Sequence, residues 1–225
     1  MTTPTVLDAR AAAVVDRLHA LDRGQMRALV AHFLPRALGA KLVGKRYDFV
    51  DTEFFRDKLV ALDADKARFC ALQCLALRAK RVVEVGTSFG VSTIFLASAM
   101  RDTGGIVIGT EIEPTKAAAA RRNFAEAGVE PFIDLRVGDA LQTLQDCGGP
   151  IDFVLVDTWI PLALPAVKLL APQLRPGAMV VCDNVTQFAD AYTGYTTWIR
   201  DPRNGFRSTT LPFKGGFETS VWIGP

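Results

Sequence analysis

Three oxygen-bearing side chains follow two apolar stretches in the second half of the chain. Asp157 comes directly after the run 151–156, and Asp183 and Asn184 follow the run 178–182. Two carboxylates and an amide carbonyl are hard oxygen ligands of the kind that Mg²⁺, Ca²⁺ or Mn²⁺ prefers. An Asp-Asn pair is also ordinary loop chemistry after a strand. The cation site is favoured because all three side chains fall at the expected cleft of the fold.

A second candidate site is the segment 81–93, Arg-Val-Val-Glu-Val-Gly-Thr-Ser-Phe-Gly-Val-Ser-Thr. Its apolar, β-branched start predicts a buried parallel strand, and Gly86 and Gly90 predict a turn into a helix. Backbone N–H groups at such a turn can approach a ligand closely. The spacing is G-x-x-x-G, not the G-x-G-x-x-G of dinucleotide-binding proteins, so the turn alone does not distinguish a ligand site from a structural turn.

The next predicted strand, 106–111, ends in the carboxylate Glu111. An acid at the tip of the second strand of a nucleotide-binding fold accepts hydrogen bonds from ribose hydroxyls. A solvated strand end is the simpler alternative for this residue. Taken together with the glycine turn, Glu111 favours an adenosine-containing ligand.

The elements that must position these residues alternate at the spacing of βαβ units from residue 81 onward. The predicted strands are 81–86, 106–111, 132–137, 151–157, 178–183, 206–211 and 217–223, and the predicted helices are 91–101, 114–127, 140–145, 162–174 and 188–200. This pattern predicts an α/β, Rossmann-like doubly wound sheet of mostly parallel strands with a C-terminal antiparallel hairpin. Ligands bind such sheets at the carboxyl ends of the strands, where both candidate sites fall.

The N-terminal part of the chain carries helical patterns. Residues 5–38 predict two helices with a break at Leu21–Gly24, and Pro35 and Gly39 are expected to end the second. An irregular connection over 40–51 is expected before the helical pattern returns. These N-terminal helices are expected to cap the fold and wall the substrate entrance, or to form a homodimer.

Length and composition predict a single domain over residues 1–225, with 1–78 as a helical cap and 79–225 as the α/β core. The formal net charge of +2 is too balanced for a nucleic-acid-binding surface. No stretch reaches the roughly 18 apolar residues of a membrane span. We therefore expect a soluble, cytoplasmic protein with a small-molecule partner and neither nucleic acid nor membrane as a partner. The four cysteines are expected in the core.

The ordered motifs resemble those of the cation-dependent class I S-adenosylmethionine O-methyltransferases, in particular the catechol O-methyltransferase family. The resemblance covers about residues 60–225. It rests on the segments Glu84–Ser92, Thr110–Pro114, Gly138-Asp139, Asp157–Trp159, Leu174–Gly177, Asp183–Val185 and Ile223–Pro225. All class I methyltransferases share the glycine motif, whereas the ordered set with Asp157 and Asp183-Asn184 is more specific.

The resemblance implies S-adenosylmethionine as the methyl donor and a role for each matching residue. The catalytic, cation-binding residues would be Asp157, Asp183 and Asn184. The cofactor contacts would be Glu84, Gly86, Thr87, Ser88, Gly90, Ser92, Glu111, Ile112, Gly138, Asp139, Ala140, Asp157 and Trp159. Of these, Glu84 and Ser92 would line the methionine half. Asp139 would contact adenine, and Trp159 would pack on the adenosine half.

The implied reaction is methyl transfer to a hydroxyl of a small, catechol-like acceptor. A phenol has a pKa of about 10, so a divalent cation would favour its ionised form. The chain departs from the family in two places. Ile160 stands where the family has a lysine base, and the loop 212–216 offers no clear acid for the second hydroxyl, for which Glu218 is a poor substitute. The candidates for a replacement base are Lys214, Tyr192 and Tyr195.

Ile160 keeps two alternatives open. One is a cation-independent methyltransferase with a vestigial metal site. The other is a non-catalytic protein that binds an adenosyl ligand. An NAD-dependent dehydrogenase is disfavoured because the chain lacks G-x-G-x-x-G and a Tyr-x-x-x-Lys pair in a plausible place.

Overall fold

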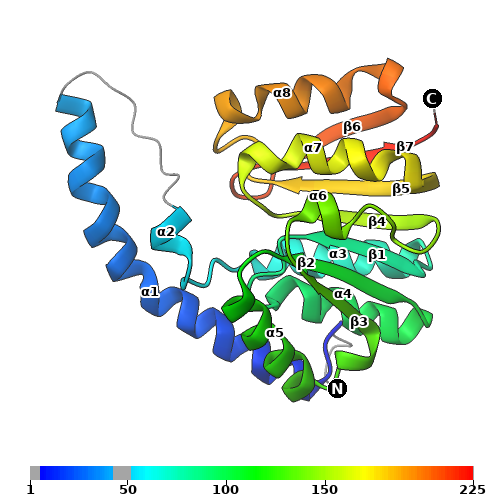
Figure 1. Cartoon of the computed structure of the whole chain (residues 1–225), viewed down its shortest axis with the longest axis horizontal. Coiled ribbons are helices and arrows are strands. Elements are labelled where there is room, and N and C mark those ends of the chain that lie inside the picture. Colours follow the sequence, from blue (N-terminus) through cyan, green and yellow to red (C-terminus); the bar gives the residue numbers. More distant parts are fainter. Residues whose placement is uncertain (1–5, 43–51, 225) are drawn as a thin grey trace.

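The computed structural model describes residues 6–42 and 52–224. Within these residues one mixed sheet has the strand order β3-β2-β1-β4-β5-β7-β6 (Figure 1). The strands are β1 (Arg81–Val85), β2 (Ile106–Glu111), β3 (Ile133–Val137), β4 (Ile151–Val156), β5 (Leu174–Asp183), β6 (Phe206–Leu211) and β7 (Phe217–Trp222). The first five run parallel, and β7 lies antiparallel to both β5 and β6. The predicted Rossmann-like sheet with its antiparallel hairpin is confirmed.

Helices cover both faces of this sheet (Figure 1). They are α1 (Ala9–Leu42), α2 (Thr52–Phe55), α3 (Ala64–Ala76), α4 (Val91–Thr103), α5 (Pro114–Ala127), α6 (Ala140–Thr143), α7 (Ile160–Leu170) and α8 (Ala189–Arg200), with short 3₁₀ turns at Glu130–Phe132, Ala171–Gln173 and Pro202–Asn204. Residues of α3, α4 and α5 belong to the core on one face, and residues of α6, α7 and α8 to the core on the other.

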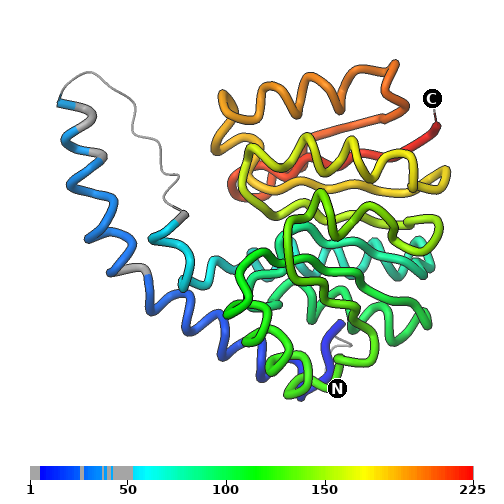
Figure 2. Tube along the Cα trace, in the orientation of Figure 1, coloured from blue at the N-terminus to red at the C-terminus, as the bar shows by residue number. Residues whose placement is uncertain are grey.

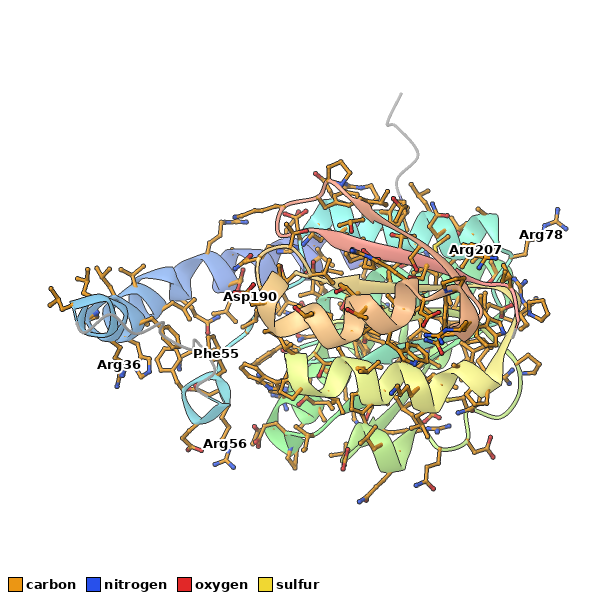
Figure 3. The ribbon with its side chains drawn as sticks, turned by 90° about the horizontal axis from the view of Figure 1, so that it is seen from above. Arg36, Phe55, Arg56, Arg78, Asp190 and Arg207 are labelled. Atoms are coloured by element: carbon orange, nitrogen blue, oxygen red, sulfur yellow. The ribbon has the colours of Figure 1, made fainter. Side chains whose placement is uncertain are left out.

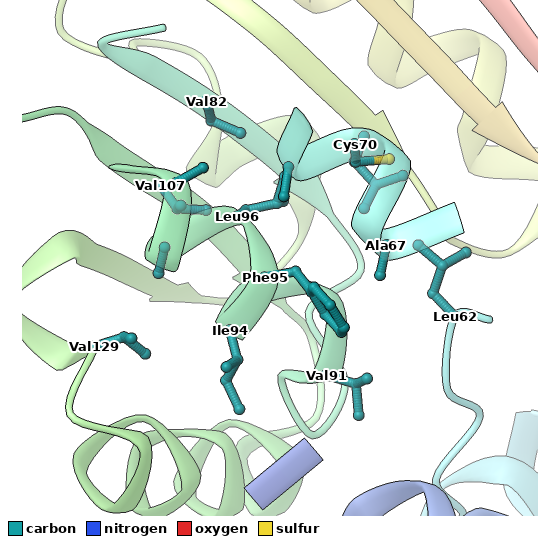
Figure 4. Packing of buried hydrophobic residues seen from close by; sticks show 14 of the residues in the cluster. Leu62, Ala67, Cys70, Val82, Val91, Ile94, Phe95, Leu96, Val107 and Val129 are labelled. Carbon is teal, nitrogen blue, oxygen red and sulfur yellow. The ribbon is translucent and has the colours of Figure 1, made fainter. Parts of the chain in front are cut away.

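The two cores follow from the period-two alternation of the strands. Val82 of β1 belongs to the first core and its neighbour Val83 to the second. Figure 4 shows the first core, in which Cys70 of α3 and Leu96 of α4 pack near Val82 and Val107. A sheet that is buried on both faces leaves its strand ends as the places where polar side chains can meet a ligand.

The predicted break at Leu21–Gly24 is wrong, because α1 is a single helix from Ala9 to Leu42. A glycine inside a helix costs only about 1 kcal/mol, which tertiary contacts can offset. Gln25 provides such a contact, since its Oε1 accepts a hydrogen bond of 3.2 Å from the backbone N–H of Leu59. Pro35 also lies inside the helix and does not end it. Most of the predicted connection, residues 43–51, lies outside the described residues.

The first turns of α1 are fixed to α5. Arg17 pairs with Glu126 at 2.6 Å, and Arg10 donates to the backbone carbonyls of Ala125 and Glu126 near the end of that helix. Beyond these contacts α1 extends away from the body of the molecule (Figure 2). The N-terminal segment is therefore anchored at the face formed by α5.

All four cysteines are free and buried, as expected for core residues. Burial raises the pKa of Cys70 and Cys74 well above the usual thiol range. No helix in residues 6–42 and 52–224 is long and apolar enough to cross a membrane.

Candidate functional site

The glycine turn lies against the end of β4. Gly86 has a φ of 99°, and a Cβ there would lie 2.1 Å from the backbone oxygen of Asp157. Only glycine therefore fits between the end of β1 and the end of β4. The close approach brings the turn 86–90 and Asp157 to one edge of the sheet.

Glu84, one residue before the end of β1, is fully buried, and only one of its carboxylate oxygens is satisfied. Its Oε2 accepts hydrogen bonds from the hydroxyls of Thr87, at 3.0 Å, and Thr93, at 2.5 Å. Its Oε1 is buried with no hydrogen-bond partner. Burial is the main cause of the raised pKa of this carboxyl. An orphaned acceptor of this kind suits a ligand that brings a cationic donor.

Glu111 is held in place by the backbone at the end of β2. Its two oxygens accept hydrogen bonds of 2.8 Å from the N–H groups of Ser88 and Glu113. Each oxygen keeps a lone pair, so a fixed carboxylate remains able to accept hydroxyl donors. The N–H of Gly138 donates to the carbonyl of Glu111 at 2.9 Å, which places the predicted Gly138-Asp139 segment beside it.

One small pocket joins several of the predicted cofactor residues. It is lined by residues 59–62 and 86–89 together with Val91, Ser92 and Asp157. Gly86, Thr87, Ser88, Ser92 and Asp157 therefore share one surface. The buried hydroxyl of Ser88 has no hydrogen-bond partner among the described residues, which leaves a second polar group available to a ligand.

The remaining predicted cofactor residues lie around this pocket. Asp139 accepts a hydrogen bond of 2.9 Å from the N–H of Leu141 and so caps α6, while Ala140 is buried. Ile112, directly after β2, and Trp159, three residues after the end of β4, are exposed apolar side chains. Their roles as cofactor contacts stay predictions.

The short helix α2 approaches the same edge. Phe55 meets Trp159 edge to face with ring centroids 5.6 Å apart, and Arg56 pairs with Glu113 at 3.0 Å. Figure 3 shows Phe55 and Arg56 leaving α2 in different directions. These contacts join α2 to the residues that follow β2 and β4.

Two carboxylates meet a single ammonium at the ends of β4 and β5. Asp183 forms a buried ion pair with Lys66 of α3, and the two residues are only 5% and 4% exposed. Burial, followed by the charges of Asp183 and Glu84, raises the pKa of Asp157 to about 8, against the opposing charge of Lys66. Burial also raises the pKa of Asp183, although Lys66 and the N–H of Asn184 act in the other direction.

Asn184 follows Asp183 with a left-handed backbone conformation at φ 62°. Its backbone N–H donates to Asp183 Oδ1 at 2.7 Å, and its Nδ2 donates to Oδ2 at 3.2 Å. Asparagine is one of the few non-glycine residues that adopt this conformation readily. The turn keeps the amide of Asn184 beside the carboxylate of Asp183.

The donor set fits a divalent cation in its chemistry. Asp157, Asp183 and Asn184 offer hard oxygen atoms, and the two carboxylates, when both are ionised, carry more negative charge than Lys66 neutralises. In the described part of the chain no three His, Cys, Asp or Glu side chains form a metal-binding group. The predicted set contains two carboxylates and one amide, so cation binding here stays a prediction.

The candidates for a replacement base differ in their exposure. Tyr192 and Tyr195 are buried in the core of the opposite sheet face, and burial raises the pKa of both phenols far above neutrality. Lys214 is exposed in the loop between β6 and β7. Glu218 is fully buried and holds Arg200 through bonds of 2.7 and 2.8 Å, so it serves the hairpin rather than an acceptor.

Lys66 is the residue that the sequence prediction missed. It stands 117 positions before its partner Asp183, so no local motif connects them. The available signal was its place in α3, where Lys66, Cys70 and Cys74 recur every four residues on the buried face.

Comparisons with known proteins agree with this geometry. A methyltransferase domain family matches residues 83–185. Catechol O-methyltransferase from Mycobacterium tuberculosis is 37% identical over 127 residues, which cover 56% of this chain and 57% of that protein. The catechol O-methyltransferase of Niastella koreensis is 29% identical over 130 residues, covering 56% and 58% of the two chains. The matches thus span little more than half the length of these relatives.

Solved structures extend the likeness over more of the chain. The O-methyltransferase TomG from Streptomyces achromogenes, solved with S-adenosylmethionine, aligns with a TM-score of 0.68 and 28% identity over 77% of this chain and 86% of that one. The fold agrees with these structures. The chain is thus similar to class I S-adenosylmethionine-dependent O-methyltransferases of the catechol O-methyltransferase type.

Proposed function

We propose that this protein transfers a methyl group from S-adenosylmethionine to a hydroxyl of a small, catechol-like acceptor with the help of a divalent cation. The observation that carries the proposal is the buried Glu84, whose free Oε1 lies beside the glycine turn and near the strand-end acids. A structural turn needs no unpaired buried carboxylate oxygen, whereas a ligand with an ammonium group would satisfy it.

The chain's own residues would hold S-adenosylmethionine from both ends. Glu84 and Ser92 would face its methionine half, where a carboxylate can accept from the amino group. The fixed carboxylate of Glu111 would accept from the two ribose hydroxyls. When bound, this cofactor supplies the methyl group on a positively charged sulfur.

Asp157, Asp183 and Asn184 would hold the cation. When bound, a divalent cation favours the ionised form of an acceptor hydroxyl. Ile160, which starts α7, offers no acceptor for that proton, and Tyr192 and Tyr195 are buried in the core. Acceptor ionisation is therefore expected to depend on the charges of the site rather than on a neighbouring side-chain base.

Positioning of the two reactants would also lower the barrier to methyl transfer. The turn 86–90 and the end of β4 are fixed against each other through Gly86 and Asp157, so ligands bound to them are held in a defined relation. Holding two reactants in line can lower a barrier by about 7–11 kcal/mol. Rigid strand ends are suited to this role.

The test combines binding and turnover. We would titrate the protein with S-adenosylhomocysteine by calorimetry and then measure methyl transfer to catechol and related diols with Mg²⁺ or with excess chelator. Cofactor binding together with chelator-sensitive turnover would support the whole proposal. Turnover that persists in chelator would favour the cation-independent alternative, and binding without turnover across the acceptors would favour a non-catalytic role.

A matched pair of variants assigns the result to the site. Glu84→Gln removes the charge beside the turn and is expected to weaken S-adenosylhomocysteine binding by at least about tenfold, since charge-assisted hydrogen bonds are the strong ones. Glu126→Gln changes an exposed acid on α5 that pairs with Arg17, and is expected to leave that binding unchanged.

A further inference from the structure

The Lys66 ammonium is part of the candidate cation site, although it cannot be a metal ligand. It is 4% exposed, pairs with one oxygen of Asp183 and lies 5.7 Å from the ring centroid of Phe217. Among the described residues it is the one basic side chain within ion-pair distance of Asp157 or Asp183. Its charge is therefore fixed beside the two carboxylates and shielded from solvent.

A charge count shows what this lysine does to a cation. Asp157 and Asp183 together provide two negative charges when ionised, and Lys66 removes one of them. An incoming divalent cation would meet a net charge of one rather than two, close to another positive charge. Like charges a few ångströms apart in a partly buried site repel strongly enough to change an affinity by about tenfold or more.

We propose that Lys66 couples divalent-cation binding to the arrival of an anionic acceptor oxygen. The lysine leaves the site one negative charge short for a divalent cation, and the ionised hydroxyl of the acceptor supplies that charge. The inference deepens the proposed function and rests on it. Lys66 acts here as a positioning residue, because it contacts Asp183 rather than the reacting atoms.

The coupling has a direction that can be measured. Without an acceptor, the cation is expected to bind weakly and to exchange. With an acceptor, the cation and the acceptor oxygen are expected to strengthen each other's binding by the same factor, since coupling free energies are reciprocal. The proton lost by the acceptor hydroxyl passes to solvent.

The decisive experiment is a calorimetric Mg²⁺ titration of the S-adenosylhomocysteine complex without any acceptor. Lys66→Met keeps a long apolar stem and removes the charge, and it is expected to bind Mg²⁺ about tenfold tighter than the wild type. Lys66→Arg keeps the charge and is expected to bind Mg²⁺ as weakly as the wild type. Equal or weaker Mg²⁺ binding by Lys66→Met would overturn the proposal, whatever the natural acceptor is.

A second arm adds catechol to the same titrations. The wild type is expected to gain at least about tenfold in Mg²⁺ affinity and Lys66→Met clearly less, whereas equal gains in the two proteins would contradict the coupling. The wild type alone also tests the proposal, because a wild type whose Mg²⁺ affinity does not rise with catechol overturns it. The test therefore remains even if the Lys66→Met protein does not fold.

The control is another ion pair of the sheet, between the partly exposed Arg175 and the buried Asp152. Arg175→Met also removes a positive charge from a buried carboxylate and is expected to leave Mg²⁺ binding unchanged. If the wild type does not bind S-adenosylhomocysteine, the proposed function itself fails. This result is distinct from a failure of the coupling, in which S-adenosylhomocysteine still binds.

Discussion

The two ends of β4 each carry an aspartate, and the two carboxylates have opposite environments. Asp152 lies near the start of the strand and pairs with Arg175, while it also accepts hydrogen bonds of 2.7 and 2.8 Å from the N–H groups of Lys80 and Arg81. Asp157 directly follows the strand and shares the single ammonium of Lys66 with Asp183. Asp152 thus accepts from three donors of the chain, whereas the charge of Lys66 is what opposes the rise in the pKa of Asp157.

The difference appears in the acidity of the two groups. Burial raises the pKa of Asp152, but the hydrogen bonds from Arg175 and the two backbone N–H groups outweigh it, and the net pKa is lowered. For Asp157, burial and neighbouring acids raise the pKa to about 8. A carboxylate that the chain satisfies by itself stabilises the fold, whereas one that it leaves unsatisfied is available to a ligand.

The strongest test exchanges each aspartate for alanine. Asp157→Ala is expected to lower the rate of methyl transfer by at least about a hundredfold, because it removes charge that the site presents to its ligands. Asp152→Ala is expected to leave the rate per folded molecule within about twofold and to lower the free energy of unfolding by about 2–4 kcal/mol. Initial rates and urea unfolding measure the two effects. A large rate loss in Asp152→Ala would break the comparison.

A glycine-to-alanine change at each end is expected to have a smaller effect. Gly86→Ala would place a Cβ 2.1 Å from the Asp157 oxygen, so we expect a loss of about 2–4 kcal/mol in unfolding free energy and at least about tenfold weaker S-adenosylhomocysteine binding. At the other end, Gly177 has a φ of 81°, and a Cβ there would lie at an ordinary contact distance of 3.5 Å from Arg175 Nη1. Gly177→Ala is expected to cost about 1–2 kcal/mol and to leave cofactor binding unchanged. Calorimetry and urea unfolding check both variants, and equal binding losses would contradict the assignment.

The smallest expected effect is on the pH dependence of stability, to which Asp157 and Asp152 contribute with opposite signs. The raised pKa of Asp157 contributes stability below its unfolded value near 4, and that contribution is lost as the pH rises through about 8. The lowered pKa of Asp152 contributes stability above about pH 4, and this is lost as the pH falls. In chelator and without cofactor, Asp157→Asn is therefore expected to gain at least about 1 kcal/mol over the wild type between pH 5 and pH 8.

The matching variant at the other end should respond at acid pH. Asp152→Asn is expected to be less stable than the wild type at pH 6 and to approach it as the pH falls below 4. Urea unfolding across the pH range provides the measurement. Parallel pH profiles for the two variants would show that the two ends do not differ in the way described.

The sheet could be predicted from the sequence because its signals are local. Runs such as 81–85 and 151–156 are mostly apolar and β-branched, interrupted by single charged residues, which is typical of strands buried on both faces of a sheet. The continuity of α1 could not be predicted in this way. Gly24 and Pro35 are helix-breaking signals, and the contact between Gln25 and Leu59 that supports the helix joins residues 34 positions apart.

For the candidate site, the positions of residues at strand ends could be predicted from the sequence. Glu84, Glu111 and Asp157 follow from strand-end positions, and the resemblance to a family gave them roles. The ion pair between Lys66 and Asp183 depends on how α3 packs against the sheet, which no spacing in the sequence specifies. The burial of the two candidate tyrosine bases could not be predicted either, because only the three-dimensional arrangement shows that Tyr192 and Tyr195 lie in the core.

The buried thiols of α3 offer a direct probe of how the helix that carries Lys66 moves. Cys70 and Cys74 are inaccessible, and burial raises their pKa so far that little thiolate forms at neutral pH. A thiol reagent can therefore modify them only when α3 separates from the sheet. The rates at which Cys70 and Cys74 are labelled, with and without ligands, would report how often α3 separates from the sheet in the native protein.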